Sequence, residues 1–140
     1  MVTIRSRPVH LIEPSTFMND SGLAVSAILQ ETDIPLQDII VLVDDIHLDM
    51  GRIRIRRRGS DGGHNGLRSV ISILSDDGFA RVRLGVGEVP VATSRIDYVL
   101  RRFEMTELQQ AKSLIRRGVD AVRSWCADGV ETTMNSFNGR

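Results

Sequence analysis

Four segments of the chain carry the hydrophobic patterns of β-strands. Residues 39–43 (IIVLV) are continuously apolar and β-branched, which is typical of a strand buried on both faces. Residues 52–56 and 81–86 alternate apolar side chains with arginine, which predicts strands with one inward face and one basic face. Residues 9–13 (VHLIE) predict a further strand, which would end at Pro14.

Other segments have the period of helices. The stretch from Asn19 offers capping side chains and then apolar residues at helical spacing, and it ends before Pro35. Residues 67–74 repeat apolar side chains at i, i+3, i+4 and i+7. Thr106 and Gln109 predict a capping box for a long helix with an apolar stripe. Residues 95–103 predict a short connecting element.

This order of strands and helices predicts an α/β fold, with a mixed sheet between layers of helices. Neither a repeat nor a linker interrupts the sequence, so we expect residues 1–140 to form one domain. Hydrophobic residues make up 41% of the sequence and charged residues 26%, as in ordinary globular proteins. A membrane span or a signal peptide is not expected, because long apolar runs are missing. We expect a cytoplasmic protein, in which the single cysteine, Cys126, is a buried thiol.

The distribution of charge is more informative than its sum. The formal net charge is zero, which argues against a general binder of polyanions. Arginine provides 17 of the 18 basic residues, and many of these arginines lie between residues 52 and 83. A local basic patch suits a partner with localised phosphates, such as an RNA end, and a solvated strand face explains the same pattern equally well.

Three polar clusters are candidates for chemistry. Met18 and Asn19 stand where an extended segment turns into a helix, and Asn19 is either the helix cap or a ligand of something else. Asp44 and Asp45 follow the buried strand 39–43, at the kind of strand end where α/β proteins bind ligands. A carboxylate there can orient a histidine that acts as general base, although a solvated turn or a cation site would also use such a pair.

The third cluster is the glycine-rich stretch GSDGGHNGL at residues 59–67. Its glycines allow a tight turn and a close approach of a ligand, and His64 with Asn65 then opens a helix. The stretch matches neither a Walker loop nor a dinucleotide fingerprint, so we expect no nucleotide cofactor. A turn with Asn65 as the helix cap would explain the glycines without explaining the histidine beside it.

Together these clusters resemble the bacterial peptidyl-tRNA hydrolase family. The matching stretches are PSTFMNDSG at 14–22, VDDIHLDMG at 43–51, GSDGGHNGL at 59–67 and RVRLGVG at 81–87. The resemblance extends over essentially all 140 residues. It implies a three-layer α/β fold and hydrolysis of the ester that joins a peptide to the 3′ ribose of tRNA, without a cofactor or a metal.

The resemblance also implies roles for the residues around the ester. Asn19 would hold substrate or the catalytic water through its amide, and Met18 would line the cleft for the peptide. Asn65 would bind the substrate near its ester, and His64 would shape the same wall. The acceptor end of peptidyl-tRNA would be the partner.

Three charged residues complete the implied set. Asp44 matches the acid that orients the catalytic histidine of the family, while Arg56 and Arg83 stand where the family binds tRNA phosphate. These implied roles suit ester hydrolysis, because a water nucleophile needs a base, a carboxylate to hold that base, and amides to fix the water and the carbonyl.

One implied residue is missing. The family carries its catalytic histidine in an N-terminal segment that this sequence does not match, and none of His10, His47 and His64 stands at its position. We expect a chain truncated at the N-terminus, without the first strand and helix of the family, with doubtful activity by itself. The family is monomeric, but an exposed sheet edge here would favour self-association. The alternative is a natural short relative that binds tRNA or other RNA without hydrolysing it.

Overall fold

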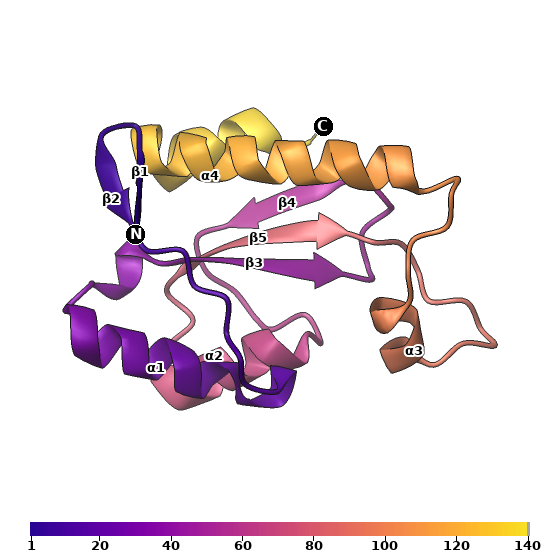
Figure 1. The fold of residues 1–140 in the computed structure, drawn as a ribbon, viewed down its shortest axis with the longest axis horizontal. Coiled ribbons are helices and arrows are strands. Elements are labelled where there is room, and N and C mark those ends of the chain that lie inside the picture. The colour runs from indigo at the N-terminus through magenta and orange to yellow at the C-terminus, as the bar shows by residue number, and fades with distance from the viewer. Residues whose placement is uncertain (140) are drawn as a thin grey trace.

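A three-stranded mixed sheet lies at the centre of the molecule (Figure 1). The computed structural model describes residues 1–139. The sheet has the order β3-β5-β4, with bounds β3 Ile40–Asp45, β5 Ala80–Gly85 and β4 Ile53–Arg56. β3 runs parallel to β5, and β4 runs antiparallel to it. The carboxyl ends of β3 and β5 therefore meet at one end of the sheet, whereas β4 ends at the other.

One face of the sheet is covered by the long helix α4, Leu108–Phe137. Ile53 and Ile55 alternate with exposed arginines, so both point towards this helix and are almost completely buried. Leu114 and Ala121 of α4 pack against them. This layer confirms the predicted inward and outward faces of residues 52–56.

The opposite face is covered by α2, Asn65–Leu74, whose apolar stripe packs on Val43 and Phe79. The helix α1, Ser21–Thr32, lies against α2 rather than against the sheet. Their contact is close because Gly22 has no side chain: a Cβ there would lie 2.3 Å from the carbonyl oxygen of Ser69. Sheet and helices thus form the three-layer α/β fold that the sequence predicts.

Two local predictions are wrong. Residues 9–13 do not form a strand as a unit; the chain instead begins with a hairpin of β1, Val2–Ile4, and β2, Arg7–Val9. Arg5 and Ser6 both have positive φ, as a two-residue hairpin turn requires. A strand needs a partner for its backbone, and here only residues up to Val9 find one.

The predicted capping box of the long helix is also absent. The residue before α4 is Glu107, and its carboxylate binds the guanidinium of Arg101 instead of capping the helix. Three short elements complete the chain: η1 Met18–Asp20, η2 Leu36–Asp38 and α3 Arg95–Leu100. The bounds of the remaining predicted helices and strands are confirmed within a few residues. The predicted burial of two strands is wrong, because β3 is an edge strand with Leu42 exposed, and Arg81 and Arg83 of β5 are buried under the chain that crosses their face.

Candidate active site

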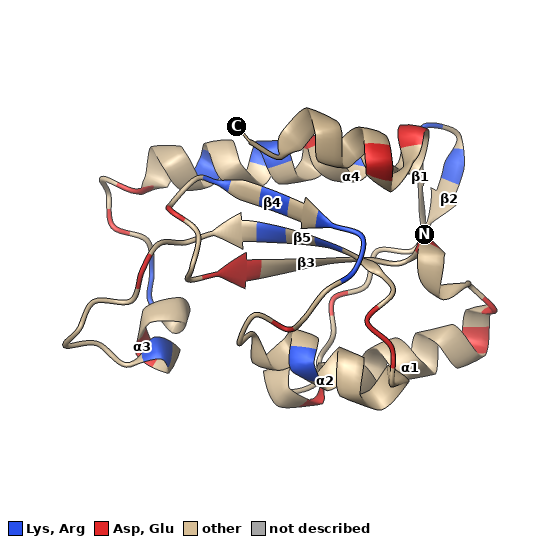
Figure 2. Cartoon of the chain, turned by 180° about the vertical axis from the view of Figure 1, so that it is seen from behind, with Lys and Arg blue, Asp and Glu red and all other residues tan. Residues whose placement is uncertain are grey.

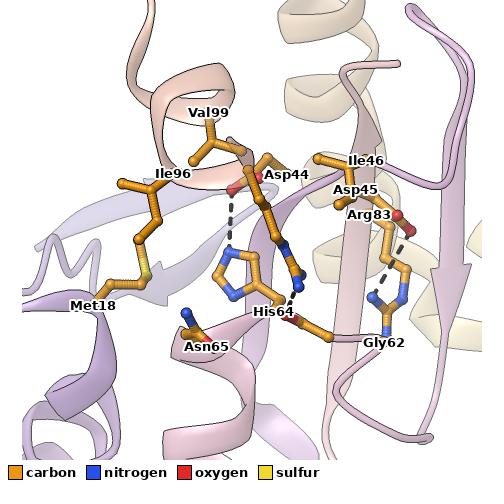
Figure 3. Close-up of a pocket in the computed structure, with 12 residues that line it drawn as sticks. Met18, Asp44, Asp45, Ile46, Gly62, His64, Asn65, Arg83, Ile96 and Val99 are labelled. Atoms are coloured by element: carbon orange, nitrogen blue, oxygen red, sulfur yellow. Dashed lines mark hydrogen bonds and ion pairs between the residues drawn. The ribbon is translucent and has the colours of Figure 1, made fainter. Parts of the chain in front are cut away.

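A cleft with polar and apolar walls opens beyond the carboxyl ends of β3 and β5, where η1, α2 and α3 meet (Figure 3). The strand β3 contributes Asp44 and Asp45, and the first turn of α2 contributes Asn65 with His64 before it. The lining residues are Met18, Asp44, Asp45, Ile46, Gly62, Gly63, His64, Asn65, Arg83, Arg95, Ile96 and Val99. Five of the seven expected site residues are therefore brought together.

His64 and Asp44 form the central pair of this cleft. The imidazole Nε2 lies 3.1 Å from Oδ1 of Asp44, and Nδ1 accepts the backbone N–H of Leu67 at 3.2 Å. Because Nδ1 accepts a hydrogen bond, its lone pair is engaged there. The neutral ring therefore carries its hydrogen on Nε2, and this N–H donates a hydrogen bond to Asp44. His64 is thus the cap of α2, and the interpretation of Asn65 as the cap is wrong.

This pairing sets the charge of Asp44. The hydrogen bond from His64 lowers the pKa of Asp44 below its ordinary value, and partial burial opposes that shift. The carboxylate is consequently ionised at neutral pH and fixes the tautomer of the ring. His64 is a poor general base in this arrangement, since a base needs a free lone pair and both ring nitrogens are engaged.

Both carboxylate oxygens of Asp45 contact other groups of the protein. Its Oδ1 accepts the backbone N–H of His47 at 2.8 Å, and its Oδ2 lies 3.8 Å from Nη1 of Arg83. Among residues 1–139, no cluster of three or more histidine, cysteine or acidic side chains could hold a metal ion. The cation-binding alternative for the aspartate pair therefore has no support in this part of the chain.

Met18 and Asn19 face different spaces although they are neighbours. Met18 lines the cleft, and it fits because Gly66 has no side chain: a Cβ there would lie 2.5 Å from the Met18 sulfur. Asn19 instead borders an adjoining groove, which it shares with Asn65. Its amide does not cap a helix, since α1 starts after Asp20 without a side-chain cap. The helix-cap interpretation of Asn19 is wrong.

The helix α3 supplies a wall that the sequence analysis missed. Arg95 donates a hydrogen bond to the carbonyl of Gly63, so α3 is tied to the glycine-rich loop. Ile96 and Val99 lie with Met18 on one side of the His64 ring (Figure 3). In the sequence, α3 showed only a short mixed pattern far from the other motifs, and nothing in that pattern indicated its place. Its apolar side chains make one wall of the cleft suitable for an apolar group.

The two arginines expected to bind phosphate have different surroundings. Arg56 is exposed on the edge strand β4 and lies outside the cleft lining. The side chain of Arg83 is 11% exposed, and its Nη2 donates to the carbonyl of Ser60 at 2.7 Å. Figure 2 shows the basic residues of β4 and β5 on adjacent strands, so both arginines belong to one basic region.

The fold and the cleft define an α/β protein with a carboxylate–histidine pair at the carboxyl end of its sheet. A model of the peptidyl-tRNA hydrolase family matches residues 1–140, and the chain belongs to this family. It is 36% identical over 139 residues to the peptidyl-tRNA hydrolase of Parabacteroides distasonis, a match that covers 99% of this chain and 74% of that protein. The enzyme of the same name from Cytophaga hutchinsonii is 39% identical over 137 residues, which is 98% of this chain and 73% of that protein.

The solved structures agree with the sequence comparison. The crystal structure of peptidyl-tRNA hydrolase from Acinetobacter baumannii superposes with a TM-score of 0.82 at 28% identity. The match covers 90% of this chain and 64% of that one, so the present chain spans less than two thirds of the solved enzyme. Within the described residues, none of the helices is both long and apolar enough to cross a membrane.

Proposed function

We propose that this chain provides the substrate-binding part of a peptidyl-tRNA hydrolase. In this reaction the oxygen of a water molecule attacks the ester carbonyl, a base takes the proton of the water, and the 3′ oxygen of the ribose leaves and is protonated. The observation that carries the proposal is the convergence of Asp44, His64 and Asn65 with Met18 at one end of the sheet.

The substrate would lie across the two adjoining spaces. An apolar residue of the peptide fits beside Met18, while Asn65 lies between the cleft and the groove and can reach the ester. The amide of Asn19, on the groove side, is available for the ribose or for water. Amides suit this work because they donate and accept hydrogen bonds without becoming charged.

The general base would be a side chain other than those that line this cleft. One oxygen of Asp44 accepts the hydrogen bond from His64, and the second oxygen can hold another imidazole in the same manner. The lowered pKa makes Asp44 itself a weak base. We therefore propose that Asp44 orients a base that the described residues do not contain.

The basic region would hold the RNA. Arg56 is exposed and can pair with a phosphate through its guanidinium, whereas Arg83 lines the cleft and would meet a phosphate there. Since peptidyl-tRNA is made where ribosomes translate, we place the chain in the cytoplasm.

We also propose that the chain associates with a second copy through β3. This strand forms one edge of the sheet, and its residues 40–43 are apolar without a charged residue that would block pairing. Leu42 is 46% exposed although it lies in the middle of the strand. Sedimentation at several protein concentrations tests this: the wild type should dimerise, and Leu42→Lys should remain monomeric. A wild type that stays monomeric throughout contradicts the proposal.

Release of a labelled peptide from peptidyl-tRNA by the 140-residue chain tests hydrolysis. Fluorescence titration with an acceptor minihelix that ends in CCA tests binding in parallel. Binding with little release is the expected result. Release that Asp44→Ala abolishes would show that the chain contains its own base, and failure to bind the minihelix would overturn the proposed function.

The alternative is a non-catalytic RNA-binding protein on the same fold, and the engaged nitrogens of His64 favour it. The two functions differ in their response to an added base. If the chain is part of a hydrolase, adding imidazole at millimolar concentration should raise peptide release. Tight binding with release that imidazole leaves at background supports the RNA-binding protein.

A further inference from the structure

The guanidinium of Arg81 is completely buried, and only backbone carbonyls accept its hydrogen bonds. Nη1 donates to the carbonyl of Gly59 at 2.6 Å, and Nε and Nη2 donate to that of Phe79 at 3.2 and 2.8 Å. Nη2 also donates to the carbonyl of Asp77. The same group stacks 4.4 Å from the centre of the Phe79 ring. Within residues 1–139 no carboxylate lies at hydrogen-bond distance from this guanidinium, which is unusual because burial penalises charge.

This arginine binds the loop that connects β4 to α2. Since β4 is antiparallel to β5, the glycine-rich loop starts at the end of the sheet that is remote from Asp44. It reaches His64 by running along β5. Arg81 holds the carbonyl of Gly59 and Arg83 holds that of Ser60, so two alternate residues of one strand bind two successive carbonyls.

The far end of the loop is held in the same manner. Arg95 donates to the carbonyl of Gly63, the residue before His64. Gly62 has a φ of 57° and lies under the guanidinium of Arg83, where a Cβ would be 2.6 Å from Nη1. The loop is thus fixed by arginines along its length, and its glycines allow the close contact.

We propose that Arg81 is a positioning residue for this site. Its guanidinium anchors the start of the Gly59–Gly63 loop on β5, and this anchor determines where the loop delivers His64 and Asn65 to Asp44. The consequence for substrate binding rests on the proposed function, whereas the consequence for the loop does not. Arginine suits this position because its planar guanidinium presents donors on Nε, Nη1 and Nη2 in fixed directions. The ammonium of lysine has three donors on a single nitrogen and cannot match carbonyls spaced in this way.

Arg81 cannot serve as a phosphate ligand in this position. Its relative exposure is 0%, and its Nε, Nη1 and Nη2 atoms all donate to carbonyls. Burial also lowers the pKa of the Arg81 guanidinium from its ordinary value. Arg56, its partner in the register of β4 and β5, is by contrast exposed on the edge strand. Substitution of Arg56 should therefore change the salt dependence of RNA binding, whereas substitution of Arg81 should not.

The test compares Arg81→Lys with Arg123→Lys in the full chain. Arg123 is the matched control because it is exposed on α4, which covers the face of the sheet opposite to α2. Hydrogen exchange of the backbone amides of residues 60–67 measures the loop, and exchange in α4 measures the rest of the molecule. Loss of hydrogen bonds to a charged group should accelerate exchange in the loop about tenfold or more, while α4 changes much less.

A second measurement separates positioning from phosphate binding. For Arg81→Lys, the affinity for the CCA minihelix should fall about tenfold with the salt dependence unchanged, because neither a phosphate contact nor a charge is lost. Arg123→Lys should keep both exchange and affinity near those of the wild type. Equal acceleration in the loop and in α4, or exchange unchanged in both, would overturn the proposal. If the wild type does not bind the minihelix, the proposed function fails while the exchange measurement still decides the role of Arg81.

Arg81→Met provides a second, more severe variant. It removes the charge and all the donors but keeps an apolar side chain beside Phe79. A folded Arg81→Met chain with wild-type exchange in the loop would also contradict the proposal. If it unfolds, the lysine variant decides alone.

Discussion

The Nε2–H of His64 donates a hydrogen bond to Oδ1 of Asp44 at 3.1 Å, while Nδ1 of the same ring accepts one from the backbone N–H of Leu67. One imidazole thereby joins the end of β3 to the first turn of α2. The ring both caps a helix and holds the carboxylate of the candidate site, so its two functions can be separated by substitution.

His64→Ala should lower the free energy of unfolding by about 1–2 kcal/mol, because α2 loses its cap and Asp44 its partner. His64→Asn should lose less, since asparagine is a good helix cap. Urea unfolding at pH 7 measures both variants. Equal losses in the two variants would show that the cap contributes little.

Asp44 should make stability depend on pH below its ordinary pKa. Its pKa is lowered from 3.8 in the folded chain, mainly by the hydrogen bond from His64, so the unfolded chain binds more protons in this range. The stabilisation by the carboxylate is fully present above the unfolded pKa and is lost as the pH falls through the folded value. Asp44→Asn should therefore be less stable than the wild type near neutral pH, and the difference should shrink as the pH falls below 3.8.

Unfolding measured from neutral pH to below 3.8 checks this dependence. Asp49→Asn serves as the control, because Asp49 is an exposed acid in the loop after β3. A difference between wild type and Asp44→Asn that stays constant across the whole range would contradict the link.

Asn19→Ala should separate binding from stability. The side chain neither caps α1 nor packs in a core, so the free energy of unfolding should change by about 0.5 kcal/mol or less. Affinity for the CCA minihelix should fall about tenfold, as expected for one lost hydrogen bond to substrate. Gln30→Ala, an exposed change on α1, is the control. Wild-type affinity in Asn19→Ala would exclude the amide from the site.

Arg56→Ala should weaken binding of the minihelix and reduce the slope of log affinity against log salt by about one, since one phosphate contact is removed. Arg123→Ala is the control, because Arg123 is exposed on α4, which covers the opposite face of the sheet. An unchanged slope would remove Arg56 from the RNA surface. For Arg83→Ala, weaker binding at an unchanged slope would show that Arg83 holds the loop through Ser60 and does not bind phosphate.

Asn138 should matter for stability although it follows the last helix. Its side chain accepts the N–H of Ile55 at 2.7 Å and donates to the carbonyl of the same residue at 2.9 Å. It thus occupies the free edge of β4 in the manner of a neighbouring strand. Asn138→Ala should destabilise the chain by about 1–3 kcal/mol, measured by urea unfolding, whereas the exposed Asn135→Ala should have little effect.

The local elements of the fold are determined by the sequence itself. The alternation of residues 52–56 and 81–86 and the apolar run before Asp44 suffice to locate the three strands of the main sheet along the sequence, because burial on a sheet face has a fixed period. The helical spacing of residues 67–74 likewise predicts α2. The polar motifs identify which strand and helix ends are chemically unusual.

The tertiary structure alone decides how those ends meet. The direction of β4 cannot be read from the local sequence pattern. Because β4 is antiparallel to β5, the glycine-rich loop runs along β5 and Arg81 is buried beneath it. The tertiary structure also determines that Met18 lines the cleft while Asn19 borders the neighbouring groove. These relationships depend on hydrogen bonds and packing between segments that are distant in sequence, for which the local period of polar and apolar residues carries no information.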